Sequence, residues 1–132
     1  MSAAGEPTRR ALRPDTLAVR GGLARSNFDE TSEALYLTSG FVYDCAEQAE
    51  AAFKDEIDKF IYSRYGNPTV SMFEERLRLL EGAEGCFATA SGMAAVFVAL
   101  GALLGKGDRL VSSRALFGSC LNQLKGYQED GF

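Results

Sequence analysis

Ser91 and Gly92 stand where a predicted buried strand turns into a predicted helix. The first N–H groups of a helix have no partner within it, and the helix dipole adds positive potential there. A glycine at such a point lets a ligand come close to the backbone. This junction, continued by Met93, suits an anion, but taken by itself the pattern favours a plain helix cap. It has neither the Gly-x-Gly-x-x-Gly nor the Gly-Lys-Ser/Thr pattern of the common nucleotide loops.

Tyr62 and Arg64 lie on either side of Ser63 in an irregular segment before the next predicted helix. In an extended chain alternate side chains point to the same side, so a phenol and a guanidinium would face one anion. Phe117 lies in a turn after a second predicted strand and offers a ring that can stack on a planar heterocycle. Taken one at a time, these residues are better explained as an exposed tyrosine, a solvated arginine and a core contact.

The predicted helix that follows Tyr62 and Arg64 has clear signals at both ends. Asn67 predicts the N-cap, Pro68 the first helical position and Gly82 the residue just past the end, so the helix should span about 68–81. Its apolar residues recur at helical spacing and predict a face buried in the core. They are Val70, Phe73, Leu77 and Leu80.

The second half of the chain predicts an α/β arrangement. Residues 86–89 and 109–112 predict short strands, and the apolar run 94–104 predicts a buried helix with a turn at 105–108 after it. A strand, helix, strand order implies parallel pairing with a right-handed crossover, and therefore a sheet covered by helices. A last helix is predicted from about Phe117.

The first part of the chain is less regular. Residues 46–59 predict a short amphipathic helix, and residues 35–43 predict an extended segment rather than a strand. Residues 2–17 predict a flexible arm, because they lack the continuous apolar stretch of a secretory signal.

Composition excludes several classes of function. The 132 residues are 46% hydrophobic, which is typical of a globular protein, and the net charge of -4 argues against a nucleic-acid partner. The chain has no histidine, which excludes histidine-dependent nucleophiles and histidine metal sites within it. Its three cysteines lack Cys-x-x-Cys spacing and fit a reducing, cytoplasmic compartment. The longest apolar run is shorter than the roughly 20 residues that span a bilayer, so no membrane partner is expected.

Three motifs together resemble one known family. In order along the chain they are Tyr62-Ser63-Arg64-Tyr65-Gly66-Asn67-Pro68-Thr69, Ala90-Ser91-Gly92-Met93-Ala94-Ala95 and Leu116-Phe117-Gly118-Ser119. From about Leu17 onward the chain is similar to the trans-sulfuration (Cys/Met metabolism) enzymes that use pyridoxal phosphate. The resemblance implies that residues 61–132 begin the large pyridoxal-phosphate-binding domain of a fold-type I aminotransferase-like enzyme, a parallel-rich α/β sheet between helices. Residues 1–60 would be an N-terminal arm and short helix that contact a neighbouring subunit.

The same resemblance implies roles for individual residues. Ser91 and the backbone amides of Gly92 and Met93 would bind the cofactor phosphate. Tyr62 and Arg64 would reach the phosphate held by a neighbouring subunit. The resemblance therefore implies a homo-oligomer, a dimer of dimers in the family, with an active site shared between subunits.

Phe117 would stack on the pyridine ring, at a position where many lyases and synthases of the family have tyrosine. This departure favours the sulfhydrylase branch that acts on O-succinylhomoserine. The resemblance then implies a γ-replacement in methionine biosynthesis, with sulfide as the nucleophile and homocysteine as the product. A cystathionine γ-synthase or γ-lyase of the same family is one alternative. A non-catalytic, truncated domain that associates with itself is another.

Pyridoxal-phosphate chemistry needs a Schiff-base lysine and an acidic partner for the pyridine nitrogen. None of the lysines at positions 54, 59, 106 and 125 stands in the family's Ser-x-Thr-Lys context. The sequence therefore predicts no catalytic residue in this chain, and it predicts that the lysine lies beyond Phe132. The chain alone is expected to be an inactive N-terminal portion.

Overall fold

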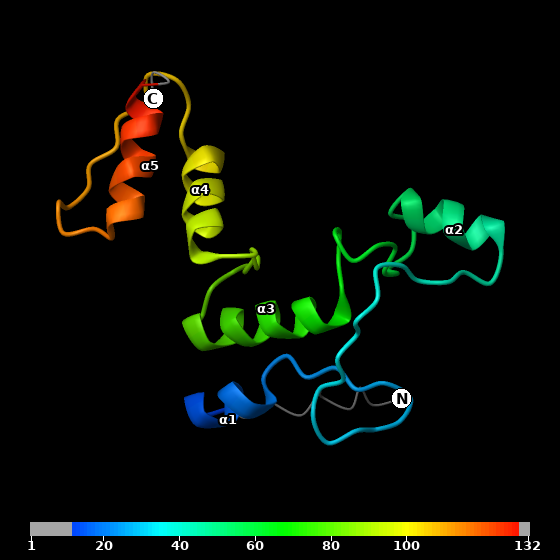
Figure 1. Cartoon of the computed structure of the whole chain (residues 1–132). Helices are drawn as coiled ribbons and strands as arrows, with labels where there is room; N and C mark the ends of the chain where they lie inside the picture. The colour runs from blue at the N-terminus through cyan, green and yellow to red at the C-terminus, as the bar shows by residue number, and fades with distance from the viewer. Residues whose placement is uncertain (1–11, 130–132) are drawn as a thin grey trace, which may run out of the picture. The chain divides into compact units, whose positions relative to one another are not determined.

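The computed structural model describes residues 12–129, and within that range it contains five helices. They are α1 (Pro14–Arg20), α2 (Ala46–Phe53), α3 (Pro68–Glu81), α4 (Gly92–Leu103) and α5 (Gly118–Glu129) (Figure 1). The chain divides into two compact units, with the boundary between Phe87 and Ala88. The first unit contains α1, α2 and α3, and the second contains α4 and α5. The expected division into an arm over 1–60 and a cofactor domain over 61–132 stays a prediction.

Helix α3 has the ends that its sequence predicts. The side-chain oxygen of Asn67 accepts a hydrogen bond from the Thr69 N–H at 2.9 Å, and Pro68 occupies the first helical position. At the other end Gly82 has a φ of 63°, and its N–H donates to the Arg78 carbonyl. The predicted helix from 68 to 81 is therefore confirmed, because both end signals act through hydrogen bonds within one turn.

Helix α1 packs against α3 within the first unit (Figure 1). The prediction of a flexible arm over residues 2–17 is wrong for Pro14 to Leu17, which form the start of α1, while residues 2–11 lie outside the described part of the chain. Proline at the first helical position favours this helix, as does an arginine, Arg20, in its last turn. The chain then turns at Gly22, whose φ is 68°.

Residues 35–43, which lie between α1 and α2, form no helix and no regular strand, in agreement with the predicted extended segment. An isolated antiparallel bridge joins Gly40 to Tyr62. Helix α2 ends at Phe53, earlier than the predicted end at residue 59, and Asp55 follows with a φ of 60°. The positive φ takes the backbone out of the right-handed helical region and so stops the helix.

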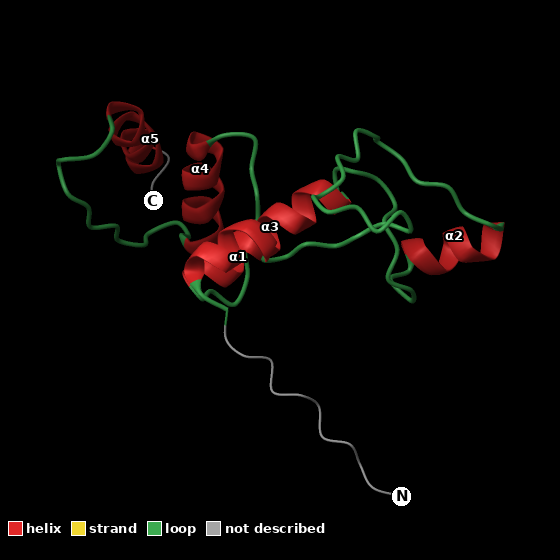
Figure 2. Ribbon diagram, turned by 90° about the horizontal axis from the view of Figure 1, so that it is seen from below, coloured by secondary structure: helices red, strands yellow, loops and turns green. Residues whose placement is uncertain are grey.

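The predicted strands at 86–89 and 109–112 are wrong for the described part of the chain, where both segments are irregular. Figure 2 shows only helices and loops. A strand is held by hydrogen bonds to a neighbouring strand, and a parallel sheet covered by helices needs several of them. Within residues 12–129 neither segment has such a neighbour, and Phe87 and Val111 are 90% and 86% exposed.

The predicted core is also wrong within these residues. The apolar face of α3 is not buried, since Phe73 is 56% exposed, and Val70, Leu77 and Leu80 are exposed as well. Helix α4 begins after Ser91 as predicted, but none of its residues is buried. Among the described residues, the buried side chains belong to Ala52, Met72 and Asn67. An amphipathic pattern predicts which side of a helix would be buried, but burial itself requires a partner surface.

In the second unit α4 and α5 run in the same direction. Met93 contacts Cys120 in the first turns of the two helices, and farther along the Phe97 ring stacks on Tyr127 with centroids 5.9 Å apart. The Tyr127 hydroxyl also donates to the Phe97 carbonyl at 3.0 Å. The loop between the helices contains the predicted turn at 105–108, closed by a bond from the Asp108 N–H to the Gly105 carbonyl. No helix in the described range is long and apolar enough to cross a membrane.

Candidate functional site

Tyr62 and Arg64 lie together, but not for the reason that the sequence suggests. The segment is a turn rather than an extended strand, because the N–H of Tyr65 donates to the Tyr62 carbonyl at 2.8 Å and that of Gly66 donates to the same carbonyl at 3.2 Å. The turn brings the Arg64 guanidinium carbon to 5.6 Å from the centre of the Tyr62 ring. The predicted extended geometry is therefore wrong, and a joint role of Tyr62 and Arg64 in binding an anion stays a prediction.

A second aromatic ring also contacts Arg64. The guanidinium carbon lies 5.2 Å from the centre of the Tyr65 ring, so two tyrosines hold one cation by cation–π attraction. Tyr62 and Tyr65 are 43% and 75% exposed. Rings bind the faces of a guanidinium, which leaves its N–H groups directed outward in the plane where phosphate oxygens bind.

Ser63 and Asn67 fasten this turn to the extended segment upstream. The Ser63 N–H donates to the Ser39 carbonyl at 2.9 Å, and its hydroxyl donates to the Thr38 carbonyl. The buried Asn67 amide donates to the Tyr36 carbonyl at 2.9 Å and to the Ser63 hydroxyl at 3.0 Å. One side chain therefore caps α3 and fixes the turn that presents Tyr62 and Arg64.

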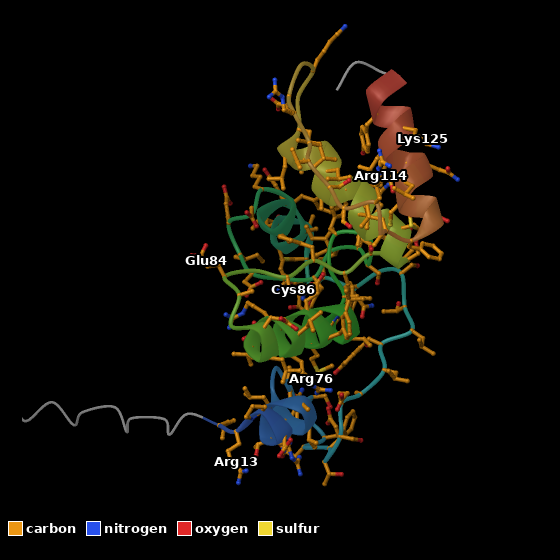
Figure 3. All side chains as sticks on the ribbon, turned by 90° about the vertical axis from the view of Figure 1, so that its left-hand side faces the viewer. Arg13, Arg76, Glu84, Cys86, Arg114 and Lys125 are labelled. Carbon is orange, nitrogen blue, oxygen red and sulfur yellow. The ribbon has the colours of Figure 1, made fainter. Side chains whose placement is uncertain are left out.

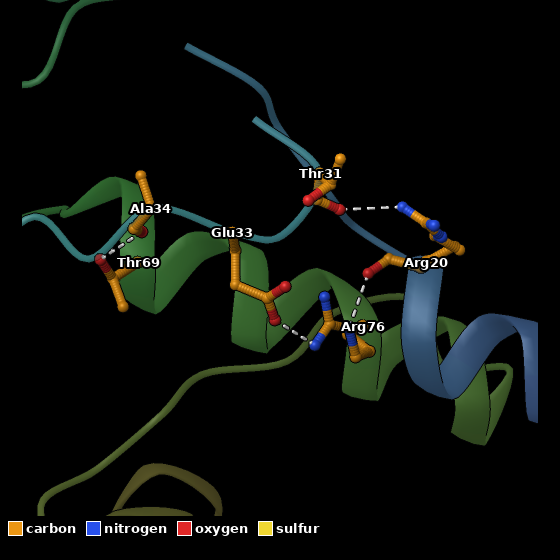
Figure 4. A network of polar contacts seen from close by, with 7 residues as sticks. Arg20, Thr31, Glu33, Ala34, Thr69 and Arg76 are labelled. Carbon is orange, nitrogen blue, oxygen red and sulfur yellow. Dashed lines mark hydrogen bonds and ion pairs between the residues drawn. The ribbon is translucent and has the colours of Figure 1, made fainter. Parts of the chain in front are cut away.

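A different arginine ties α3 to α1. The Arg76 Nε donates to the Gly21 carbonyl at 2.9 Å, and the guanidinium forms an ion pair with Glu33 (Figure 4). This hydrogen bond from Arg76 is the main reason that the pKa of the Glu33 carboxyl lies below its ordinary value. In the same way, Glu75 raises the pKa of Arg78. These arginines have carboxylate partners, whereas Arg64 is held by rings.

The N-terminus of α4 has the predicted form. The Ser91 hydroxyl accepts a hydrogen bond from the Ala94 N–H at 3.1 Å and so caps the helix. A side chain added at Gly92 would meet no atom within 4 Å, so there is open space beside the backbone at this point. The N–H groups of Gly92 and Met93 belong to the first turn, where helical amides have no intrahelical acceptor. This end of α4 suits an anion.

Phe117 lies at the same end of the second unit. Its carbonyl accepts the N–H of Cys120 at 2.9 Å and so begins α5, and the ring is 71% exposed. Cys120 in turn contacts Met93, sulfur to sulfur at 3.7 Å. The structure therefore brings Gly92, Met93 and Phe117 to the shared N-terminal end of α4 and α5. Tyr62 and Arg64 belong to the other unit.

The four lysines are distributed over both units. Lys125 is on α5, where Figure 3 labels it together with Arg114 of the preceding loop. Lys54 follows α2, Lys106 lies in a turn, and both are exposed. Lys59 is half-buried beside Tyr43, 5.7 Å from the ring centre. Within residues 12–129, no group of three or more cysteine, aspartate and glutamate residues is placed to hold a metal ion.

Sequence reasoning missed three contributors to the site. The sequence names Tyr65 only within a motif, although an aromatic residue on each side of an arginine is a visible signal for a cation–π contact. Asn67 is predicted only as a helix cap. No sequence signal indicates its hydrogen bonds to Tyr36, which is 31 positions away, or to Ser63, which is 4 positions away across a turn that was not predicted. Cys120 gave no pattern at all.

The arrangement fits a phosphorylated planar cofactor. A capped helix start with open space at Gly92 suits the phosphate, and an exposed ring at Phe117 suits the heterocycle. In the first unit, Arg64 lies beside two aromatic rings, and a guanidinium group can donate hydrogen bonds to phosphate oxygens. These residues agree with the chemistry of pyridoxal phosphate.

Comparison with known proteins identifies the family. The family described as Cys/Met metabolism PLP-dependent enzyme matches residues 15–130. The O-succinylhomoserine sulfhydrylase of Mycobacterium tuberculosis is 70% identical over 105 residues, which is 80% of this chain and 26% of that protein. The O-succinylhomoserine sulfhydrylase of Pseudomonas aeruginosa is 47% identical over 113 residues, 86% of this chain and 28% of that protein. The L-methionine gamma-lyase of Porphyromonas gingivalis is 38% identical, over 78% of this chain and 26% of that protein.

A solved structure agrees with these relatives. It is a putative O-acetylhomoserine (thiol)-lyase from Campylobacter jejuni, with a TM-score of 0.80 and 29% identity over 91% of this chain and 30% of that chain. It carries N'-pyridoxyl-lysine-5'-monophosphate at its position 205. The present chain spans about a quarter of the length of the curated relatives it matches. From these matches it follows that the chain belongs to the pyridoxal-phosphate-dependent enzymes of cysteine and methionine metabolism.

Proposed function

We propose that the full-length protein containing this chain replaces the succinyloxy group of O-succinylhomoserine with sulfide, so that the γ-oxygen leaves as part of succinate. The carbon–oxygen bond at the γ-carbon breaks, a carbon–sulfur bond forms there, and succinate and homocysteine are released. Bound pyridoxal phosphate supplies the electron sink for this chemistry. The observation that supports the proposal is the 70% identity over 105 residues to a mycobacterial O-succinylhomoserine sulfhydrylase. The family match over residues 15–130 contains every residue of the candidate site.

The residues of this chain would bind and orient the cofactor. Gly92 and Met93 would donate backbone hydrogen bonds to the phosphate, with Ser91 holding the helix start in shape. Phe117 would lie against the pyridine ring and exclude water from one face. Because phenylalanine has no hydroxyl, position 117 would take no part in proton transfer.

A steady-state assay of the full-length protein tests the reaction. O-succinylhomoserine with sulfide should give the highest kcat/KM, measured as homocysteine formed. Cysteine in place of sulfide tests the cystathionine γ-synthase alternative, and cystathionine as sole substrate tests the cystathionine γ-lyase alternative. Methionine should be assayed as a further sole substrate, because L-methionine gamma-lyases are also among the relatives. A higher kcat/KM with any of these three would overturn the assignment.

We also propose that the active site is shared between subunits of a cytoplasmic dimer of dimers, with Tyr62 and Arg64 reaching the phosphate that a neighbouring subunit holds at Gly92. Subunit mixing tests this arrangement. Arg64→Gln and Gly92→Asp variants, each of low activity alone, should recover activity when combined, because one site in each mixed dimer then has both halves intact. If each site belongs to a single chain, mixing will restore nothing.

The irregular segments 86–89 and 109–112 are proposed to pair as parallel strands in the complete domain, which would also cover α4. The polypeptide of residues 1–132 by itself should be inactive, because none of its lysines stands in the context that the family uses for the cofactor. Homocysteine formation by that polypeptide, with its mass verified, would contradict this expectation.

A further inference from the structure

We infer that Tyr65 is a positioning residue that holds the Arg64 guanidinium ready for the cofactor phosphate. The inference rests on the proposed role of Arg64 and adds a residue to it. The observation behind this inference is a pair of distances. The centre of the Tyr65 ring lies 5.2 Å from the Arg64 guanidinium carbon, nearer than the centre of the Tyr62 ring at 5.6 Å. The 62–65 turn makes this contact possible, because it brings the two rings to one cation.

The kind of partner matters for anion binding. A carboxylate beside an arginine, such as Glu33 beside Arg76, offsets its charge and occupies its in-plane N–H groups. An aromatic ring attracts the cation through its face and leaves both the full charge and the N–H groups available. The pair of rings around Arg64 therefore limits the motion of the guanidinium while its capacity to bind a phosphate is kept.

The hydroxyl of Tyr65 is not needed for this role. The ring contact depends on the π face, which phenylalanine shares and tryptophan strengthens. Tyr65 is also 75% exposed, so its replacement removes little buried surface, and the fold should tolerate it. The backbone bond from Tyr65 to the Tyr62 carbonyl is independent of the side chain. These features separate an effect on Arg64 from an effect on folding.

The experiment measures pyridoxal phosphate affinity in the full-length enzyme by titration of the apoenzyme. Tyr65→Leu should raise the Kd roughly 3- to 10-fold, which corresponds to the cation–π range for exposed to partly desolvated sites. Tyr65→Phe should stay within about twofold of the unmodified enzyme, and Tyr65→Trp should bind at least as tightly. Pyridoxal, which lacks the phosphate, should bind all these variants equally.

Two controls separate the possible outcomes. Phe28→Leu removes another exposed aromatic, 91% exposed, and should leave the Kd unchanged. Arg64→Gln should weaken phosphate-dependent binding more than Tyr65→Leu does. If Arg64→Gln weakens binding and Tyr65→Leu does not, the role of Tyr65 is wrong and that of Arg64 stands. Equal losses for Tyr65→Phe and Tyr65→Leu would also overturn the inference. If Arg64→Gln has no effect, the proposed phosphate role of Arg64 fails first.

Discussion

At the contact between α1 and α3, Gly22 lies against the α3 backbone, and an added Cβ would come within 2.8 Å of the Met72 carbonyl oxygen and 2.9 Å of the Arg76 nitrogen. At the start of α4, an added Cβ on Gly92 would meet nothing within 4 Å. In the first region Arg76 pairs with the Glu33 carboxylate and donates to the Gly21 carbonyl. The contact between α1 and α3 is therefore closely packed, whereas the start of α4 leaves open space beside its first N–H groups.

The two regions should respond differently to substitution in the full-length protein. Changes in the α1 to α3 contact should lower the stability of the folded protein and leave cofactor affinity nearly intact. Changes at the start of α4 should lower cofactor affinity and leave the stability of the apoenzyme nearly intact.

Gly92→Asp should have the largest effect, a loss of pyridoxal phosphate affinity of roughly 100-fold, because a carboxylate would face the phosphate at short range. Aspartate in the first helical turn favours the helix dipole, so the thermal midpoint of the apoenzyme should not fall. Cofactor titration and thermal unfolding of the apoenzyme measure the two quantities. A lower midpoint with unchanged affinity would reverse the comparison.

Gly22→Ala should destabilise the protein by about 2 kcal/mol, because alanine is strained at positive φ and its Cβ would press on the α3 backbone. Cofactor affinity should stay within about twofold of the unmodified protein, which is well below 1 kcal/mol. Gly85→Ala is the matched control, since a Cβ there has open space. Denaturant unfolding checks both variants, and equal stabilities would show that the close approach at Gly22 relaxes freely.

Asn67→Asp should cost about 1 kcal/mol, less than Asn67→Ala, because aspartate keeps the cap to Thr69 but cannot donate to Tyr36 or Ser63. Since those donated bonds hold the turn with Arg64, cofactor affinity should also fall slightly. Urea unfolding and cofactor titration of both variants provide the check. If aspartate and alanine are equally destabilising, the cap contributes nothing beyond the bonds to the arm.

Glu33→Gln should have the smallest effect, and it should depend on pH. The pKa of the Glu33 carboxyl is lowered mainly by its hydrogen bond with Arg76, so its contribution is present above the unfolded pKa of about 4.3 and is lost as the pH falls through the folded value. The unmodified protein should unfold at a slightly higher temperature than the variant at neutral pH. That gap should narrow and close as the pH falls below the unfolded pKa of the carboxyl. A gap independent of pH would remove the ion pair as its cause.

Features that depend on nearby residues were predictable from the sequence. The N-caps at Asn67 and Ser91, the end of α3 at Gly82 and the turn at 105–108 are confirmed. Each is determined by a hydrogen bond or a backbone preference within a few residues, so the residue types carry the information. The family was also predictable from the sequence, because three short motifs carry the resemblance.

Features that need a distant partner were decided by tertiary structure alone. The segments 86–89 and 109–112 have the composition of strands but no neighbouring strand among the described residues, so they remain irregular. The face of α3 around Phe73 is apolar yet exposed, because a pattern cannot supply the surface that covers it. The sequence alone determined both ends of α3 and the start of α4, because their end signals act within one turn of the helix. Only the folded chain decided what the side chains of the helices contact, because contacts between distant segments depend on geometry that no local pattern contains.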